Sequence, residues 1–387
     1  MIPNYLARAN EIGDTLSELR EAFHRRPELG NQEFQTAARI ESVLQECGLE
    51  VTRPLPTAVV GTLKGGRPGP TVAIRADMDA LPILEQTGAP FASQNPGVMH
   101  ACGHDVHMAA ALGAAMLLSQ QRETLPGTVK FFFQPDEEGE GGAQRMIAAG
   151  CMAGVSAVFG AHVTPDLEAG QIGVKYGKFY ASSDVFNIVL HGKGCHGAER
   201  EKGIDALAAA ARLVPELLAL PEHFPNERSV VSVGSFHAGT AGNIVCDRAE
   251  LQGIVRTLGS DTRTAMRGLL KDTIRRMAIE TDAKADVILR ESYPGVVNHD
   301  NASAFVERTA RAVFGDASVF VLDTPTMKTE DFGYFLASCP GAYYHVGAGC
   351  ELPLHNPAFL PDAKAVVNAA ALHASVAHTF LEESGTL

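Results

Sequence analysis

The sequence predicts an α/β protein with a smaller ferredoxin-like domain inserted into a larger α/β domain. The chain has 387 residues, more than the roughly 250 to 300 that one hydrophobic core usually supports, so we expect two domains. Short apolar runs typical of buried strands alternate with segments of helical spacing, which indicates α/β layers. Within residues 181–291 the order changes to strand, helix, strand, strand, helix, strand, the ferredoxin-like pattern. We therefore predict a discontinuous main domain, 1–180 and 292–387, around the insertion 181–291.

The main domain begins with apolar residues at helical spacing over residues 6–25, interrupted by Pro27 and Gly30. Residues 71–76 predict a buried strand, residues 106–119 a buried helix, and residues 129–133 a second strand that stops at Pro135. The stretch "VSAVFGAHVTP" repeats the strand pattern, with His162 just past its apolar run. Residues 301–315 and 362–383 predict helices that cover the same core.

The inserted segment contains six predicted elements. Strands are predicted at 184–193, 228–236, 248–258 and 284–291, and helices at 204–220 and 261–280. A segment of about a hundred residues is long enough to close as a domain by itself.

Composition and charge exclude several function classes. Hydrophobic residues make up 45% of the chain and charged residues 20%, as in ordinary globular proteins. The formal charge of −13 disfavours nucleic acid and anionic membranes, which bind through Lys and Arg. We find no apolar run approaching ~20 residues and no signal-peptide pattern at the start. With seven scattered cysteines, best understood as reduced thiols, the sequence predicts a cytoplasmic protein that acts on a small molecule.

The stretch "MHACGHDVHM", residues 99–108, concentrates three histidines, a cysteine and an aspartate. Imidazole and thiolate are ligands of borderline-soft metals. No second C-x-x-C or H-x-x-x-H tract completes a closed site around Cys102 and His104, so their partner ligands must come from distant segments. We expect His100 and His107 to be core or hydrogen-bonding residues.

Further candidate ligands follow the predicted strands. In open α/β sheets, functional groups collect beyond the carboxyl ends of the strands. The candidates at such positions are Asp77, Asp79, Glu137, Glu138, His162 and His355. A lone histidine is more often structural, and adjacent glutamates are common in solvated loops. The convergence of several candidates at strand ends favours a metal site.

The Glu137–Glu138 pair suits metal-assisted hydrolysis. If the two residues are extended, their side chains point to opposite sides, so that one binds metal and the other faces the substrate. Two metals ~3.5 to 4 Å apart lower the pKa of a bound water and polarise a carbonyl, while a carboxylate transfers the proton to the leaving nitrogen.

Nine motifs occur in one order along the chain: "RADMDALP", "HACGHDVH", "FFFQPDEEGEGGA", "GAHV", "GKGCHGA", "AGTAGNIV", "GIVRT", "MKTEDFGYF" and "LHNPAF". Together they resemble the aminoacylase and carboxypeptidase superfamily of dinuclear metallohydrolases, and within it the amidohydrolase branch with hippurate hydrolase and the plant auxin-conjugate hydrolases. The resemblance covers nearly the whole chain. It implies a zinc-peptidase-like catalytic fold, an inserted lid or dimerisation domain, a homodimer and two divalent metal ions (Zn, Mn, Co or Ni).

The resemblance also implies a role for each candidate residue. It makes Glu137 the general base and acid, and Asp79 the carboxylate that orients the metal site. His196 would hydrogen-bond the developing oxyanion, often across a dimer, while Asn243 and Arg256 would lie near the substrate carboxylate, unless they are only a turn Asn and a surface Arg. The implied metal ligands are Cys102, His104, Glu138, His162 and His355.

The expected function is hydrolysis of the amide bond of N-acyl or N-aroyl amino acids, which gives a carboxylic acid and a free amino acid. A dipeptidase or carboxypeptidase on the same scaffold is the nearest alternative. From other classes, Cys102 as the nucleophile of a thiol hydrolase and an inactive binding protein stay open. The stretch "GAEREKGID" after His196 departs from the "A-x-P-H" usual in the branch, so substrate preference is expected to differ.

Overall fold

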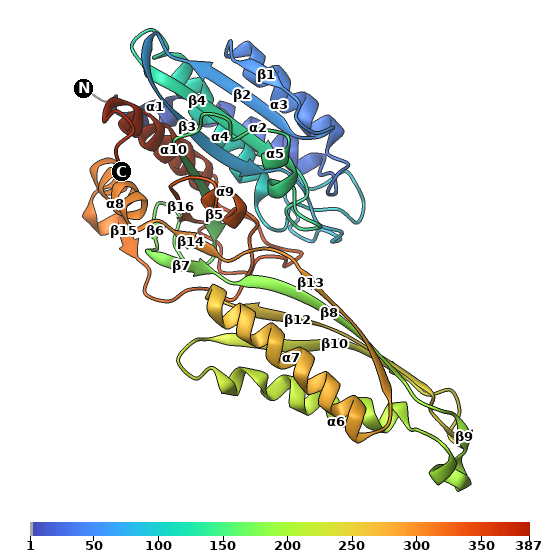
Figure 1. Cartoon of the computed structure of the whole chain (residues 1–387). Helices are drawn as coiled ribbons and strands as arrows, with labels where there is room; N and C mark the ends of the chain where they lie inside the picture. Colours follow the sequence, from blue (N-terminus) through green and yellow to red (C-terminus); the bar gives the residue numbers. More distant parts are fainter. Residues whose placement is uncertain (1–2) are drawn as a thin grey trace. The chain divides into compact units, whose positions relative to one another are not determined.

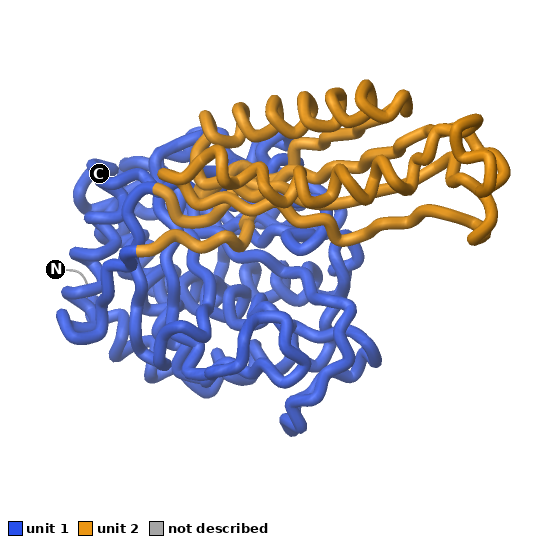
Figure 2. Tube along the Cα trace, turned by 90° about the horizontal axis from the view of Figure 1, so that it is seen from below, with its two compact units in different colours: residues 1–177, 297–323, 331–387 blue, residues 178–296, 324–330 orange. Residues whose placement is uncertain are grey.

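The computed structural model describes residues 3–387 and divides into two compact units (Figure 2). Unit 1 comprises Met1–Gly177, Val297–Asp323 and Asp331–Leu387, and unit 2 comprises Lys178–Val296 and Thr324–Glu330. The second segment of unit 2 lies outside the predicted insertion. It belongs there because Thr326 donates its N–H to Phe179 O and Ala181 donates its N–H to Lys328 O, contacts between residues distant in sequence.

Unit 1 is built on one eight-stranded sheet with the order β1-β2-β4-β3-β5-β16-β6-β15 (Figure 1). The central strands β4, β3, β5 and β16 are parallel to one another. The strands are β1 (Glu50–Thr52), β2 (Val59–Lys64), β3 (Arg67–Asp77), β4 (Pro126–Gln134), β5 (Ala157–Thr164), β6 (Ile172–Val174), β15 (Val319–Val321) and β16 (Gly341–Gly347). The carboxyl ends of the four parallel strands therefore meet at one edge of the sheet.

Helices cover both faces of this sheet. Successive side chains of β4 point to opposite faces: Phe131 and Phe133 join the main core, whereas Phe132 stacks on Phe335 of α9. Helices α4 and α10 supply much of that main core. The helices of unit 1 are α1 (Tyr5–Glu11), α2 (Gly13–Arg25), α3 (Phe34–Glu46), α4 (His104–Ser119), α5 (Ala143–Ala148), α8 (Asp300–Phe314), α9 (Gly333–Leu336) and α10 (Lys364–Glu382).

Two predicted helices have different bounds. The helix predicted over 6–25 is broken into α1 and α2, because Ile12 leaves the helical conformation with φ −102° and ψ 14° just before Gly13. Helix α4 begins at His104, two residues before the predicted start, which places a candidate ligand in its first turn. No helix within residues 3–387 is long and apolar enough to cross a membrane.

Unit 2 contains a four-stranded antiparallel sheet with the order β10-β12-β8-β13. Helices α6 and α7 pack on one face through a separate core, which includes Phe186, Leu213 and Ile274. This arrangement is ferredoxin-like. Its elements are β8 (Ser182–His191), α6 (Ala206–Ala219), β10 (Ser229–Ala238), β12 (Arg248–Thr257), α7 (Ser260–Glu280) and β13 (Lys284–Glu291).

The remaining strands form two small two-stranded sheets. Strand β9 (Cys195–His196) pairs with β11 (Ile244–Val245), and β7 (Gly177–Tyr180) pairs with β14 (Val296–Asn298). Short 3-10 helices lie at Gly197–Lys202, Leu220–His223 and Asp316–Ser318. The pair β9 and β11 lies at one end of unit 2 (Figure 1).

Candidate metal centre

The carboxyl edge of the unit 1 sheet brings together all five predicted metal ligands and Glu137. These residues form three overlapping groups of possible metal ligands, and within each group the donor atoms lie no more than 4.8 Å apart. Cys102 Sγ is 3.5 Å from His162 Nε2, and Glu138 Oε1 is 3.1 Å from His355 Nε2. The three groups are Cys102 with His104 and His162, Cys102 with Glu138 and His355, and His104 with Glu137 and Glu138.

The turn before α4 places Cys102 and His104 on either side of Gly103. Gly103 has φ +86°, and a Cβ there would come within 2.4 Å of Val163 Cγ2, so only glycine fits this turn without strain. His104 Nδ1 lies 2.8 Å from the carbonyl oxygen of Asp79. Its Nε2 is buried without a hydrogen-bond partner among the described residues. An unpartnered imidazole nitrogen among a thiol and carboxylates is the donor set that a divalent metal ion needs.

Asp79 holds the two glutamates through their backbone. Its Oδ1 accepts the N–H of Glu137 and its Oδ2 accepts the N–H of Glu138, both at 2.9 Å. These glutamates lie in a turn after β4, so the expected alternation of an extended strand is wrong. The turn directs both carboxylates to the same cluster, beside His104. Asp136, which begins the turn, has φ +60°, an uncommon backbone conformation for a residue other than glycine.

His162 and His355 reach the cluster from β5 and from the loop before α10. His162 lies inside β5 rather than past its end, and its Nδ1 is 2.7 Å from Val163 O. His355 adopts φ +67° and donates its N–H to Ala101 O at 2.9 Å. That hydrogen bond ties the loop to the residue before Cys102.

Electrostatics favour a cation at this point. Burial raises the pKa of the Cys102 thiol well above its usual value, and the charges of Glu138 and Glu137 add to the increase. Such a thiol is protonated near neutral pH, which argues against Cys102 as a thiolate nucleophile. Burial lowers the pKa of His104, but Asp77, Asp79 and Glu138 outweigh it and raise the pKa to about 10. A metal ion would take the place of these protons.

The predicted substrate-binding residues lie in unit 2 and do not form one group. Ile244 pairs with His196, and Gly197 donates its N–H to Asn243 O at 2.8 Å, so His196 and Asn243 are neighbours. Arg256 lies near the carboxyl end of β12, which begins at Arg248. It is half-buried, and its Nη1 has no hydrogen-bond partner within residues 3–387. Arg256 is therefore not an ordinary surface arginine.

A buried polar network lies beside the cluster, and the sequence did not predict its connections: it gave Asp77 only as a candidate at a strand end and His107 only as a core or hydrogen-bonding residue. Asp77 Oδ1 lies 2.6 Å from His107 Nδ1 and 3.8 Å from His104 Nε2. Arg75 and Asp331 extend the network, with 2.8 Å between Arg75 Nη2 and Asp331 Oδ1. The available signal was an arginine within the apolar run "TVAIRAD", since a fully buried arginine requires partners.

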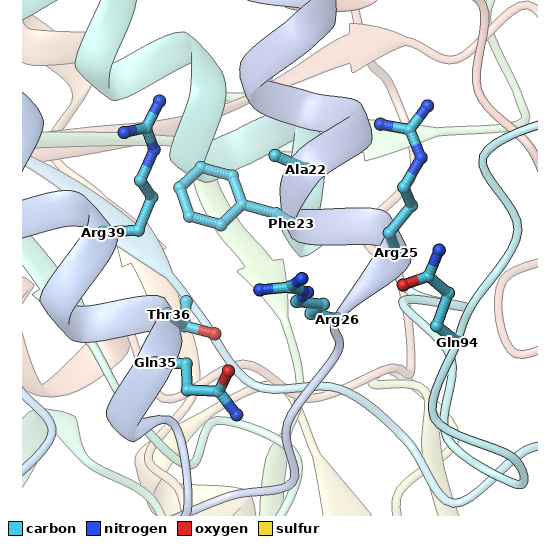
Figure 3. A pocket seen from close by; sticks show the side chains of 8 residues that line it. All are labelled: Ala22, Phe23, Arg25, Arg26, Gln35, Thr36, Arg39 and Gln94. Carbon is cyan, nitrogen blue, oxygen red and sulfur yellow. The ribbon is translucent and has the colours of Figure 1, made fainter.

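Unit 1 also contains a pocket with a volume of about 400 Å³ between α2 and α3 (Figure 3). Arg25 and Arg26 line one part, Arg39 lines another, and Phe23 lies between them. None of the predicted site residues lines this pocket. The pocket is therefore separate from the candidate metal centre.

Comparisons with known proteins show which proteins this chain is similar to. Residues 73–379 match the family model described as peptidase family M20/M25/M40. The chain is 39% identical to N-acetylcysteine deacetylase of Bacillus subtilis, over 95% of this chain and 97% of that protein. It is 35% identical to thermostable carboxypeptidase 1 of Saccharolobus solfataricus, over 96% of each chain. A crystal structure of a dinuclear metal-binding M20 peptidase from Bacillus subtilis superposes with a TM-score of 0.86, at 37% identity, over 96% of this chain and 99% of the other.

Proposed function

Because the chain belongs to peptidase family M20/M25/M40 and is a metal-binding amide hydrolase, we propose that it cleaves N-acyl or N-aroyl amino acids to a carboxylic acid and a free amino acid. The main support is that Cys102, His104, Glu138, His162 and His355 form overlapping groups of donor atoms, and that Glu137 lies in one group with His104 and Glu138. Similarity to an N-acetylcysteine deacetylase supports an N-acylated amino acid as the substrate.

The proposed chemistry divides the work between bound metal ions and Glu137. Divalent ions held by the five ligands would polarise the substrate carbonyl and lower the pKa of the attacking water. Glu137 accepts a proton from that water as its oxygen bonds to the carbonyl carbon. It then donates the proton to the amide nitrogen as the C–N bond breaks. Asp79 keeps Glu137 in place by accepting its backbone N–H.

The ligand types narrow the choice of metal. Thiolate and imidazole favour Zn, whereas carboxylates and open positions also accommodate Mn, Co or Ni. We propose two ions, since the five ligands leave positions free for water and substrate, and since a similar solved structure is a dinuclear metal-binding peptidase.

We further infer a role for unit 2 as a lid and dimerisation domain. His196 would donate a hydrogen bond to the oxyanion from a second copy of the chain. The guanidinium of Arg256, with its unpartnered Nη1, suits a substrate carboxylate, which guanidinium groups bind in a bidentate manner. Sedimentation at several concentrations tests the homodimer. A monomer that is fully active would contradict this role.

We also propose that the protein acts in the cytoplasm, where its thiols stay reduced. All seven cysteines are free in residues 3–387, and reduced thiols are the rule in that compartment. Fractionation of cells that express the full chain tests this proposal.

A carboxypeptidase acting on peptides is the second candidate, because the chain is 35% identical to a carboxypeptidase over 96% of its length. The deciding experiment loads the metal-free protein with Zn, Mn, Co or Ni and compares hippurate and N-acetyl amino acids with dipeptides that have a free amine. We expect higher kcat/KM for the N-acylated compounds. Faster turnover of the dipeptides would favour the second candidate.

Glu137→Gln tests the mechanism on the best substrate found. We expect kcat to fall by about 10²- to 10⁴-fold, the usual contribution of a general base, while the number of bound metal ions stays the same. Full activity of this variant would refute the assigned mechanism.

A further inference from the structure

Histidines contact the backbone of Val163 at both its N–H and its carbonyl oxygen. Its N–H donates to His107 Nε2 at 2.9 Å, and its carbonyl oxygen lies 2.7 Å from His162 Nδ1. Because His162 Nδ1 is occupied by this carbonyl, its Nε2 is the nitrogen that lies beside Cys102 Sγ. The backbone conformation at Val163, which sets the direction of this carbonyl, therefore decides which nitrogen of His162 faces the cluster.

The contacts of His107 determine its tautomer. Its Nε2 accepts an N–H and so bears no proton. The ring proton must therefore be on Nδ1, which lies 2.6 Å from Asp77 Oδ1 and donates to it. The hydrogen bond at one imidazole nitrogen thus sets the role of the other.

The carboxylate of Asp77 is itself fixed from behind. Arg75 Nη1 donates to Asp77 Oδ2 at 2.5 Å, and Arg75 Nε donates to Gln134 Oε1 at 2.9 Å. Gln134 Nε2 in turn donates to Asp331 Oδ2 at 2.7 Å. All four side chains are buried, so rotating Asp77 away would leave buried charges without partners, at a high energetic cost.

We propose that His107 is a positioning residue for the metal centre, and that by accepting the Val163 N–H it holds the backbone of Val163, whose carbonyl oxygen orients His162. The inference rests on the proposed function in one respect, the role of His162 as a metal ligand. His107 is not a metal ligand itself, although His104, Asp77 and His107 lie close enough to form a metal-binding group. Both of its ring nitrogens are already engaged, one by Asp77 and one by Val163.

Two amide substitutions separate the contacts of His107. In His107→Gln the amide oxygen can occupy the place of Nε2 and accept the Val163 N–H. In His107→Asn the amide takes the place of Nδ1, reaches Asp77 and leaves the Val163 N–H without an acceptor. Both variants lose the edge-to-face contact with the His162 ring, whose centroid lies 4.6 Å away. Each variant therefore keeps one hydrogen bond of His107 and gives up the other, and only His107→Asn loses the one to Val163.

The experiment measures metal affinity by competition with a chromogenic chelator, and the absorption of the Co(II)-loaded full chain. We expect His107→Asn to weaken binding of one ion by about 10- to 100-fold, the usual effect of losing a hydrogen bond that orients a ligand, and to change the Co(II) spectrum. His107→Gln should stay within about threefold of the unchanged chain, the scatter expected from local context. Equal affinities for the two variants would overturn the proposal.

His373→Asn is the matched control, because His373 is another buried histidine, with its Nδ1 2.7 Å from Tyr344 Oη. It should lower thermal stability without changing the Co(II) spectrum. An equal spectral change in this control would show that any buried-histidine loss disturbs the site, and would count against the proposal.

A measurement on the unchanged chain keeps the proposal testable if the variants do not fold. Nitrogen-15 NMR of the imidazoles should show His107 protonated at Nδ1 and unprotonated at Nε2. The opposite tautomer would refute the contact with Val163. None of these readouts requires turnover, so a chain that binds metal but does not hydrolyse N-acyl amino acids would contradict the proposed function alone.

Discussion

His24 is expected to make the stability of unit 1 depend on pH in the alkaline range. Its Nδ1 lies 2.9 Å from Asp105 Oδ2, and its Nε2 lies 3.1 Å from Glu85 Oε1. The His24 and Asp105 side chains are fully buried. Burial by itself lowers the pKa of His24, but the hydrogen bonds and charges of Asp105 and Glu85 outweigh it and raise the pKa from 6.5 to about 9.

The size and direction of the effect follow from this pKa. A histidine with a raised pKa in the folded state stabilises the fold fully below its unfolded pKa of 6.5, and the stabilisation is lost as the pH rises through about 9. At about 1.4 kcal/mol per pKa unit, the increase from 6.5 to about 9 corresponds to about 3 kcal/mol. We expect the free energy of unfolding to decrease by about this amount between pH 6 and pH 9.5.

The assay compares the unchanged chain with His24→Asn, which keeps a donor for Asp105 but cannot be charged. Urea unfolding is followed by circular dichroism at several pH values, with EDTA present so that metal binding does not contribute. The advantage of the unchanged chain should shrink by about 3 kcal/mol over this range. His191→Asn is the control, because His191 pairs with Asp286 at the surface, where ion pairs contribute only about 0 to 1 kcal/mol. An advantage that stays constant with pH, or an NMR titration of His24 near 6.5, would refute the reasoning.

Three further predictions concern the metal centre. Metal binding at pH 8 should release about two protons, from His104 with its pKa of about 10 and from the buried Cys102 thiol with its raised pKa. Calorimetry in buffers of different ionisation enthalpy measures the number of protons released, and a release of none would contradict the prediction. Asp79→Asn should leave one backbone N–H without an acceptor and lower metal affinity by about 10- to 100-fold. Chelator competition measures this affinity, and an unchanged affinity would contradict the prediction. Gly103→Ala should lower the melting temperature of the protein more than Gly150→Ala. Both glycines have φ near +87°, but only at Gly103 does a side chain lie within 2.4 Å of the new Cβ. Equal melting temperatures for the two variants would contradict this close contact.

The sequence predicted the fold class because its elements have distinct periods and lengths. The strand and helix pattern of residues 181–291 was sufficient to predict the ferredoxin-like unit, whose sheet has the order β10-β12-β8-β13. It was not sufficient to place residues 324–330, since their hydrogen bonds to β7 and to Ala181 join segments far apart in the sequence. The break between α1 and α2 was also missed, because apolar spacing continues through Ile12.

The sequence predicted which types of side chain supply the metal-binding atoms of the candidate site, but it did not predict how those side chains are arranged. Placing Glu137 and Glu138 after a buried strand was right, whereas their supposed extended conformation was wrong. The turn depends on Asp79, which follows another strand, β3, and accepts both N–H groups. His107 was described only as a core or hydrogen-bonding residue, because the partner that defines its contact is the backbone of Val163.

By itself, the sequence determined which ligand atoms are available and that several of them lie near the ends of strands, because side-chain chemistry and hydrophobic period are local properties. Tertiary structure alone decided that β3, β4, β5 and β16 are parallel neighbours, and so that thiol, imidazole and carboxylate groups between positions 102 and 355 meet. It also decided the buried partners of each imidazole. Hydrogen bonds between distant segments select one tautomer and one ring orientation, and no local pattern encodes them.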